Sequence, residues 1–338
     1  MTAIGQLGVA VVGCGLIGSR RARTAALHPR TRLCTVVDSD AARAAQLAGG
    51  ACDVTADWRS AIERDDVNVI VVSTPNVLLA DVAVAALERG RHVLMEKPMG
   101  RTLAEAERIA AAATASGAVL QVGFNHRHHP AVSRARETVR CGGIGRLISI
   151  RARYGHGGRP GLEREWRSDP VQAGGGELID QGVHVVDLIH WIAGMPRSAY
   201  ALVQTAVWPI SPLEDNAYGL LAFEHGVVAQ LHVSMTQWKN LFSLELHGDA
   251  GAVTVEGLGG SYGVERLIHV DRAFQGGAPD VHEERFEGED GSWSSEWNAF
   301  VSAIDGGAAT AGPAEGVAAM RILEALYRSA RAGTPVVV

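Results

Sequence analysis

The chain has 338 residues, of which 47% are hydrophobic and 20% are charged. This composition is typical of a globular protein rather than a disordered chain, and the length favours two domains. A formal net charge of −6 argues against a nucleic-acid ligand, which needs basic surface to neutralise its phosphates. The longest uncharged apolar stretch, Leu7–Gly18, is shorter than the roughly 20 residues of a membrane-spanning helix.

The first part of the chain, residues 1–125, alternates short β-rich runs with alanine-rich amphipathic segments. Strands are predicted at Leu7–Val12, Leu33–Asp38, Val69–Thr74, His92–Met95 and Val119–Phe124. Helices are predicted between them at Gly18–Leu27, Ala41–Leu47, Ala80–Arg89 and Leu103–Ser116. This alternation predicts an α/β Rossmann domain, a doubly wound parallel sheet with helices on both faces.

The second part, residues 126–338, changes in texture from about Tyr154. A glycine-led helix is predicted at Gly174–Ala193, and runs of period two follow at Ala199–Val207, Asn216–Phe223, Val227–Ser234, Phe242–Gly248 and Ala252–Glu256. They predict an α+β domain with a large, mostly antiparallel open sheet. The polar stretch Gly276–Ser295 is predicted to be a loop. A final amphipathic helix, at about residues 314–331, can pack back toward the first domain.

A glycine-rich turn follows the first predicted strand and opens a helix. Its G-x-G-x-x-G spacing allows a tight turn, close approach of a pyrophosphate and close packing of helix on strand. Asp38 ends the second strand, 20 residues after the last glycine, where a carboxylate holds ribose hydroxyls and repels a 2′-phosphate. We therefore expect NAD rather than NADP, with Arg43 as the counterargument. The residues expected at the cofactor are Gly13, Gly15, Leu16, Ile17, Gly18, Asp38 and Ser39.

Lys97 lies in the segment Glu96-Lys97-Pro98, directly after the fourth predicted strand. An open α/β sheet binds its ligand at this carboxyl edge. Lys97 and Lys239 are the only lysines, beside 29 arginines, so a lysine kept here suggests chemistry that a guanidinium cannot perform. An ammonium next to a nicotinamide cation has a lowered pKa and can take the proton from an alcohol.

Asp180 and His184 stand four residues apart in the glycine-led helix of the second domain. This spacing places both side chains on one helical face. An aspartate in that position can orient an imidazole that relays the proton of a substrate hydroxyl. A buried polar pair with a purely structural role is the alternative.

Together these features resemble the Gfo/Idh/MocA family, which includes glucose–fructose oxidoreductase and inositol dehydrogenase. The resemblance covers nearly the whole chain and includes the glycine loop and five further segments, Ser73–Asn76, Ala85–Pro98, Gly123–Arg127, Gly174–Asp187 and Ile322–Ala330. One departure is Leu79, where relatives often carry a histidine. We expect this change to alter packing rather than chemistry.

The resemblance implies that Lys97, Asp180 and His184 form the catalytic set. Lys97 and His184 handle the alcohol proton, and Asp180 holds the substrate or orients the other two. Further cofactor contacts are implied for Thr74, Asn76, Glu96, Lys97, Asn125, Trp166 and Arg167. Arg127 is a candidate substrate contact, and an ion pair between the domains is its alternative.

We therefore expect an NAD-dependent dehydrogenase that oxidises a ring secondary alcohol of a sugar, aminosugar or inositol and passes the hydride to nicotinamide. Acidic side chains near Trp166 suggest a cationic aminosugar or aminocyclitol from an antibiotic pathway, with a solvated acidic loop as the alternative: Glu163, Glu165, Asp169 and Glu177. A glycosidase that recycles NAD without net NADH, and a non-catalytic dinucleotide sensor, are the other hypotheses. The complete catalytic set argues against the sensor.

Several further expectations concern partners and location. No metal is expected, because His126, His128 and His129 have no carboxylate or cysteine at ligand spacing and fit a solvated turn between the domains. The apolar sheet of the second domain suggests a homodimer or homotetramer. The start of the chain, Met1–Gln6, lacks a basic secretory segment. Four cysteines without C-x-x-C spacing predict reduced thiols in the cytoplasm.

Overall fold

The computed structural model describes residues 6–338; the expected lack of a secretory segment falls mostly on residues 1–5, outside this range. The chain divides into two compact units, each described here by itself. The first unit comprises residues up to Phe124 together with Trp293–Val317, and the second comprises Asn125–Ser292 and Ala318–Val338. Within residues 6–338, none of the helices has the length and apolar character that crossing a bilayer requires.

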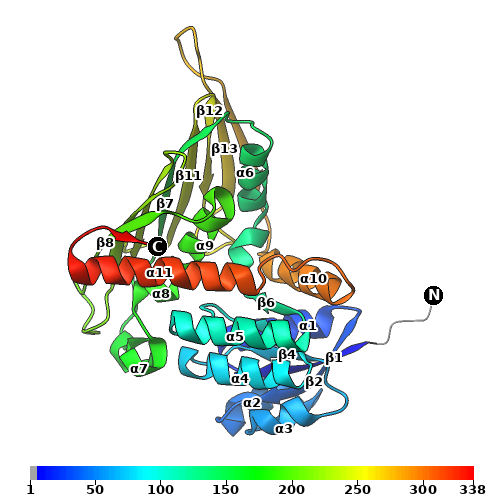
Figure 1. Cartoon of the computed structure of the whole chain (residues 1–338). Helices are drawn as coiled ribbons and strands as arrows, with labels where there is room; N and C mark the ends of the chain where they lie inside the picture. The colour runs from blue at the N-terminus through cyan, green and yellow to red at the C-terminus, as the bar shows by residue number, and fades with distance from the viewer. Residues whose placement is uncertain (1–5) are drawn as a thin grey trace. The chain divides into compact units, whose positions relative to one another are not determined.

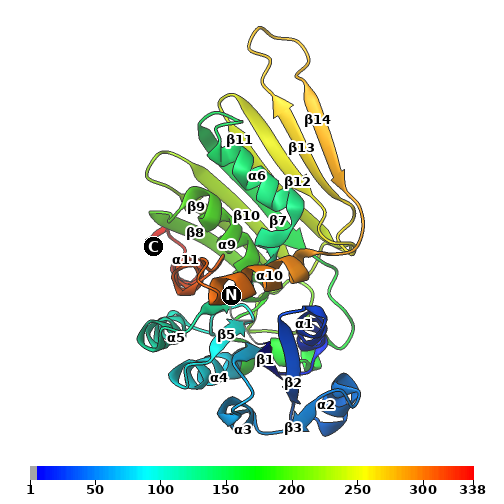
Figure 2. The ribbon, with the colours of Figure 1, turned by 90° about the vertical axis from the view of Figure 1, so that its right-hand side faces the viewer.

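The first unit is built on a six-stranded sheet with the order β3-β2-β1-β4-β5-β6. All of its strand pairs are parallel, and helices lie on both faces (Figures 1 and 2). The strands are β1 Leu7–Val12, β2 Thr31–Val37, β3 Asp53–Thr55, β4 Val69–Val72, β5 His92–Met95 and β6 Leu120–Val122. The helices are α1 Leu16–Leu27, α2 Ala41–Ala48, α3 Trp58–Glu63, α4 Asn76–Glu88, α5 Leu103–Ser116 and α10 Ser292–Ile304. The predicted doubly wound sheet is confirmed.

The core of the first unit joins segments from both ends of its sequence. Val9 and Val11 of β1 and Ala22 of α1 are buried in one cluster with Trp297 and Phe300 of α10. Burial of two large aromatic rings against the glycine-loop helix fixes α10 to the sheet, because apolar surface is removed from water on both elements. A segment nearly 300 residues along the chain thus belongs to the fold that carries the glycine loop.

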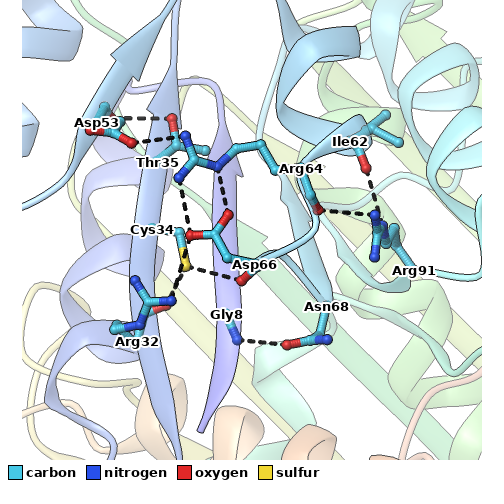
Figure 3. A network of polar contacts seen from close by, with 10 residues as sticks. All are labelled: Gly8, Arg32, Cys34, Thr35, Asp53, Ile62, Arg64, Asp66, Asn68 and Arg91. Carbon is cyan, nitrogen blue, oxygen red and sulfur yellow. Dashed lines mark hydrogen bonds and ion pairs between the residues drawn. The ribbon is translucent and has the colours of Figure 1, made fainter.

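A polar network lies at the amino-terminal end of this sheet, near the first residues of β1 and β4 (Figure 3). The Arg64 guanidinium donates to Asp53 and to Asp66, at 2.8 Å each. The Arg91 guanidinium donates to the carbonyl oxygens of Ile62 and Arg64. These contacts tie the loop after α3 to its neighbours, far along each strand from the carboxyl edge.

The second unit contains a nine-stranded sheet with the order β14-β13-β12-β11-β7-β10-β9-β8-β15. Only the β10–β7 pair is parallel, so the predicted mostly antiparallel sheet is confirmed. Its strands are β7 Leu147–Gly155, β8 Ser198–Gln204, β9 Asn216–Ala222, β10 Val228–Ser234, β11 Leu241–Gly248, β12 Gly251–Glu256, β13 Glu265–Asp271, β14 Val281–Phe286 and β15 Val336–Val337. Its longer helices are α6 Pro130–Arg140, α9 Gly182–Ala193 and most of α11 Pro313–Ala332. Short helical segments are η1 Asn125–His128, η2 Leu162–Arg164, η3 Trp166–Ser168, α7 Pro170–Ala173 and α8 Glu177–Asp180.

Two sequence predictions are wrong in this region. The expected loop Gly276–Ser295 contains strand β14 and the start of α10. Strand β14 was missed because its residues, largely charged, carry no period-two apolar pattern; pairing with β13 holds it at the sheet edge. The predicted continuous helix Gly174–Ala193 is divided, because Gly174 adopts a left-handed conformation (φ 82°) and the chain breaks again at Gln181.

Candidate functional site

The glycine loop of the first unit has the geometry of a dinucleotide cradle. Gly13 has φ 96°, and a Cβ atom there would lie 2.4 Å from the Ser73 carbonyl oxygen. A Cβ atom on Gly18 would lie 1.7 Å from the Gly13 carbonyl oxygen. A Cβ atom on Gly15 would meet nothing within 4 Å. Gly13 and Gly18 therefore allow close packing. Gly15 leaves open space at the start of α1, where amide groups and the helix dipole favour a phosphate.

Asp38 directly follows β2, beside this loop, and is partly buried. Its Oδ2 accepts a hydrogen bond from the Cys14 backbone amide (2.8 Å), and its Oδ1 accepts one from the Asp40 amide (2.9 Å). Arg43 Nη1 lies 3.5 Å from both carboxylate oxygens. The acid is thereby held against the loop, while Arg43 is engaged by carboxylates of this chain. Ser39 is exposed next to it.

The other expected cofactor residues are divided between the two units. In the first unit, Leu16 is exposed at the start of α1 and Ile17 is half-buried; Thr74 and Asn76 flank the start of α4, with Asn76 buried. Lys97 follows β5 and is half-buried. In the second unit, Asn125 donates to Ser292 Oγ (3.0 Å). Trp166 and Arg167 form η3.

Glu96 is held by an arginine that sequence reasoning missed. Arg21 of α1 donates from Nε to Glu96 Oε1 (2.8 Å), and its Nη1 donates to Glu296 of α10. The Trp293 ring lies 4.5 Å from the Arg21 guanidinium carbon. We call Arg21, Glu96 and Glu296 the buried triad. The two carboxylates raise the pKa of Arg21 and outweigh the opposing effect of burial.

Asp180 and His184 lie on two successive helices of the second unit, rather than on one continuous helix. Asp180 ends α8, and its Oδ2 accepts a hydrogen bond from Arg167 Nε (3.1 Å). His184 lies in the first turn of α9, where its amide donates to the Gln181 carbonyl oxygen (3.1 Å). The carboxylate therefore has an arginine partner close to it, and Gln181 separates its helix from that of His184.

The histidine-rich turn before α6 is buried, so the expectation of a solvated turn is wrong. The His126 ring stacks on the His184 ring, with centroids 3.9 Å apart and an interplanar angle of 19°. Tyr154 of β7 packs edge-on against His126 at 5.1 Å. Burial raises the pKa of Tyr154 well above its usual value, and Tyr262 adds to this effect. Tyr154 therefore keeps its proton in this cluster.

His129, in the same turn, is also buried and bonds to Glu265 of β13. Its Nδ1 lies 2.9 Å from Glu265 Oε2, while Glu265 Oε1 accepts from the Ala131 amide (2.6 Å). These contacts account for the burial of the turn, because buried polar side chains need hydrogen-bond partners within the packed structure. Among the described residues, the structure contains no group of three or more His, Cys, Asp or Glu side chains that could hold a metal ion.

Arg127 forms a buried ion pair with Asp187 of α9. Its Nε lies 2.8 Å from Asp187 Oδ2, and its Nη2 lies 2.6 Å from Oδ1. Both residues belong to the second unit, so the expected ion pair between domains is wrong: the partner is in the same unit. A two-pronged pair of this kind fixes η1 to α9, and thus His126 relative to His184.

The start of α8 is anchored by Glu214, which sequence reasoning also missed. Glu214 Oε1 accepts from the amides of Gly176 (3.1 Å) and Leu178 (3.0 Å) and from the Tyr327 hydroxyl (2.7 Å). A Cβ atom on Gly176 would lie 2.1 Å from the Glu214 carbonyl oxygen. The glycines before α8 are thus needed for close packing. Burial raises the pKa of Glu214, although these hydrogen bonds oppose the shift.

The acidic side chains near Trp166 are mostly engaged by their neighbours. Glu165 accepts from Arg159 Nε (2.7 Å), and Glu163 lies 3.7 Å from Arg164. Asp169 caps α7 by accepting from the Val171 amide (2.9 Å). The local structure therefore engages three of the four acids without a cationic ligand, and the fourth, Glu177, is buried with its Oε1 3.9 Å from His156 Nε2.

Comparison with known proteins gives a consistent result. Residues 7–124 match the model of an oxidoreductase family with an NAD-binding Rossmann fold, and residues 132–254 match the GFO/IDH/MocA C-terminal domain. Levoglucosan dehydrogenase of Pseudarthrobacter phenanthrenivorans is 30% identical, over 59% of this chain and 58% of that protein. The chain thus aligns with less than two thirds of that relative's length.

Two other relatives align over more of the chain. The dTDP-3,4-didehydro-2,6-dideoxy-alpha-D-glucose 3-reductase of Streptomyces antibioticus is 30% identical, over 83% of this chain and 80% of that protein. GenD2 from gentamicin A biosynthesis, solved in complex with NAD, is 30% identical with a TM-score of 0.85, over 99% of this chain and 97% of that one. Residues 7–124 therefore form an NAD-binding Rossmann domain.

Proposed function

The chain belongs to the GFO/IDH/MocA family of NAD-binding oxidoreductases, and from this premise we propose that it is a dehydrogenase acting on a ring secondary alcohol. The observation that carries the proposal is the position of Lys97. It follows β5 at the carboxyl edge of the sheet, in the same unit as a glycine loop and an Asp38 that fit NAD. Alcohol oxidation requires a proton-accepting side chain at this edge, whereas a dinucleotide sensor does not require one.

The residues divide the work of binding and proton transfer. When bound, NAD supplies the hydride acceptor. Gly13–Gly18 bind the pyrophosphate, Asp38 binds the adenosine ribose, and residues 74–76, Glu96, Asn125 and Trp166–Arg167 line the remainder of the cofactor. Lys97 removes the hydroxyl proton, His184 assists it, and Asp180 holds the substrate. In this assignment Arg127 acts by fixing η1, because its guanidinium is committed to Asp187.

The proposed substrates are sugars, aminosugars and inositols. The acids near Trp166 are engaged by local partners, so they do not argue for an aminosugar. The support for an aminosugar comes instead from the relative GenD2 of gentamicin A biosynthesis. A sugar without an amine is supported by the levoglucosan and dTDP-sugar enzymes. Residues 1–125, to which Trp293–Val317 are added in the fold, then form the NAD-binding domain, and the rest of residues 126–338 forms the domain for substrate and self-association.

Association into a homodimer or homotetramer is proposed for the second unit. Large side chains on β8, β9 and β10 are exposed on one face of its sheet: Leu202, Tyr218, Leu220 and Val228. An apolar face of this kind gains free energy when a second copy removes it from water. All four cysteines are free, which supports a reducing location such as the cytoplasm.

The test is NADH formation from NAD by the purified protein, across a panel of inositols, sugars, dTDP-sugars and aminoglycosides. With a responsive compound, Lys97→Ala is expected to lower kcat by about two to four orders of magnitude, because it removes the general base. NADH binding, measured by fluorescence, should stay within about threefold, since ordinary contacts away from the pyrophosphate contribute little.

The matched control is Lys239→Ala, which removes the other lysine from an exposed loop. It should retain turnover. Near-normal turnover by Lys97→Ala would overturn the assigned role. Release of an aglycone without net NADH would instead identify a redox-cycling hydrolase.

A further inference from the structure

Trp238 is an exposed aromatic residue in a backbone conformation that its side chain does not favour. It lies between β10 and β11, where it is 68% exposed and has φ 56°. Among the described residues other than glycine, it alone has a positive φ. A bulky residue in this left-handed region is strained, and such strain persists only where the surrounding structure imposes it. We call residues 235–240 the tryptophan loop.

The tryptophan loop is held on both sides of the strained residue. Before it, the Gln237 amide donates to the His156 carbonyl oxygen (3.1 Å). After it, Asn240 Nδ2 donates to the Ser261 carbonyl oxygen (3.1 Å). Within the part of the chain that the structure describes, the Trp238 indole itself has no hydrogen-bond partner. The neighbours of Trp238 therefore impose its backbone conformation, and the indole is left available to a ligand.

Glycines let the tryptophan loop approach the chain that follows β7. A Cβ atom on Gly157 would lie 3.4 Å from the Trp238 Cα atom, which is van der Waals contact. A Cβ atom on Gly158 would lie 2.3 Å from ring atom Cε2 of Trp208, which is closer than a side chain can come. Residues 155–158 contain only one side chain beyond hydrogen, that of His156. The backbone of Trp238 thus packs directly against a bare stretch of main chain.

The same end of the second unit carries the residues assigned to the substrate. The Tyr154 ring in β7 has its centroid 6.3 Å from that of His184. Two residues further along, His156 Nε2 lies 3.9 Å from Oε1 of Glu177 in α8, the helix that Asp180 ends. The chain that leaves β7 therefore passes the proposed substrate residues before it reaches the tryptophan loop.

The separation along this segment exceeds one sugar ring. Gly157, which contacts the Trp238 backbone, follows Tyr154 by three residues, or about 10 Å of extended chain. A single ring held at Asp180 and His184 is shorter than this distance, whereas two linked rings match it. Trp238 is therefore placed for the part of a substrate that lies next to the reacting ring.

We propose that Trp238 is a stacking platform for the second ring of a two-ring substrate, a disaccharide or an aminosugar linked to another ring. The C–H groups on one face of a sugar ring form an apolar surface, which the negative face of an indole attracts and shields from water. An indole on a backbone that is already fixed loses little conformational entropy on binding. This inference rests on the proposed function and narrows its substrates to compounds with a second ring.

The test compares matched one-ring and two-ring compounds: D-glucose with cellobiose, and D-glucosamine with its disaccharide. NADH formation is measured with NAD, and dissociation constants are measured by calorimetry in the presence of NADH. The intact chain is expected to bind the two-ring member about five- to thirtyfold more tightly. Trp238→Gly should bind both members equally within about twofold, with the loss in KM rather than kcat, because the platform holds substrate equally before and during the reaction.

The same variant gives a readout that does not depend on the substrate. Glycine adopts a positive φ without strain, so Trp238→Gly should raise the midpoint of thermal unfolding by about 1–3 °C. Trp238→Phe keeps both an aromatic ring and the strain, so it should retain most of the two-ring preference with little change in the midpoint. A lower midpoint in Trp238→Gly would mean that the indole has a packing role and would overturn the proposal.

Phe274→Ala is the matched control. Phe274 is 70% exposed in the same unit, between β13 and β14, and its φ is not positive. Its removal should leave the two-ring preference and the midpoint unchanged. An equal loss of preference in this variant, or a preference that survives in Trp238→Gly, would overturn the inference. So would a change in the number of subunits of Trp238→Gly, measured by light scattering, since the indole would then serve self-association.

The two measurements separate this inference from the proposed function. Equal binding and turnover of one-ring and two-ring compounds by the intact chain would contradict the platform and leave the proposed function intact. Tighter binding of a two-ring compound without NADH formation would contradict the proposed function alone. The absence of both binding and turnover with every compound would contradict both.

Discussion

Arg64 and Arg21 both belong to the first unit, and each contacts two carboxylates, but water reaches only one of the two groups. The Arg64 side chain is 32% exposed, and its partners Asp53 and Asp66 are 68% and 39% exposed (Figure 3). Arg21 is wholly buried with Glu96 and Glu296. Asp66 also lies 3.5 Å from Arg32, so the exposed group has a second cation as well as access to solvent (Figure 3).

Solvent changes how strongly the charges in each group interact. Around Arg64, water and salt screen the charges, and the guanidinium lowers the pKa of Asp66 to about 2, mainly by hydrogen bonding. Such exposed pairs contribute little to stability. Around Arg21, the charges interact more strongly, because the interior screens weakly. The Arg64 group is thus a surface clamp, whereas the Arg21 group is a buried ion-pair network.

The largest expected effect follows from Arg21→Met, which leaves two buried carboxylates without a cation. We expect the first unit to lose about 3–5 kcal/mol of free energy of unfolding, as when one partner of a buried ion pair is removed. Urea unfolding at pH 7.5, monitored by tryptophan fluorescence, measures the loss. A loss below about 1 kcal/mol would show that water reaches the triad, and the comparison with Arg64 would fail.

A second set of substitutions tests whether the buried charges are needed for stability at all. The triple variant Arg21→Met, Glu96→Leu and Glu296→Leu replaces the triad with apolar side chains. We expect it to recover about 2–4 kcal/mol relative to Arg21→Met alone, because well-packed apolar groups often match a buried ion pair. The same urea titration measures this recovery. Failure to recover would assign the stability to the hydrogen bonds of the triad.

Glu214, in the second unit, is a third kind of carboxylate: buried, but bonded to uncharged donors. Burial raises its folded-state pKa above the ordinary value of 4.5. The folded protein therefore holds this proton more tightly than the unfolded chain does, so the contribution to stability is greatest below pH 4.5 and is lost as pH rises through the raised pKa. Glu214→Gln should flatten this slope, seen by comparing urea midpoints between pH 4.5 and 7.5. An identical slope in the variant would assign it to other groups.

The smallest effect is expected for Arg64→Met. The lowered pKa of Asp66 contributes stability above its unfolded value of 3.8, and this contribution is lost as pH falls toward about 2. Because the pair is exposed, removal of Arg64 should cost less than about 1 kcal/mol at pH 7 and less still at high salt. Thermal unfolding with and without about 0.5 M salt checks both statements. A loss as large as that of Arg21→Met would contradict the distinction between the two networks.

Local spacing in the sequence was sufficient to single out the glycine loop and Lys97 as candidate site residues. Gly13, Gly18 and Asp38 are adjacent to strands whose apolar runs mark them, and their spacing reflects contacts within one βαβ unit. The helix Leu103–Ser116 was located to the residue because Thr102 caps it and Gly117 ends it. Each of these features depends on neighbours that are close along the chain.

Tertiary structure alone decided the groups that surround those residues. Arg21 meets Glu96 and Glu296 across separations of 75 and 275 residues, and Glu214 meets Tyr327 across 113. A short edge strand such as β14 and the break at Gln181 likewise depend on what packs beside them. Sequence patterns report periodicity and local hydrogen bonding, whereas the pairing of buried charges depends on which distant segments the folded core brings together.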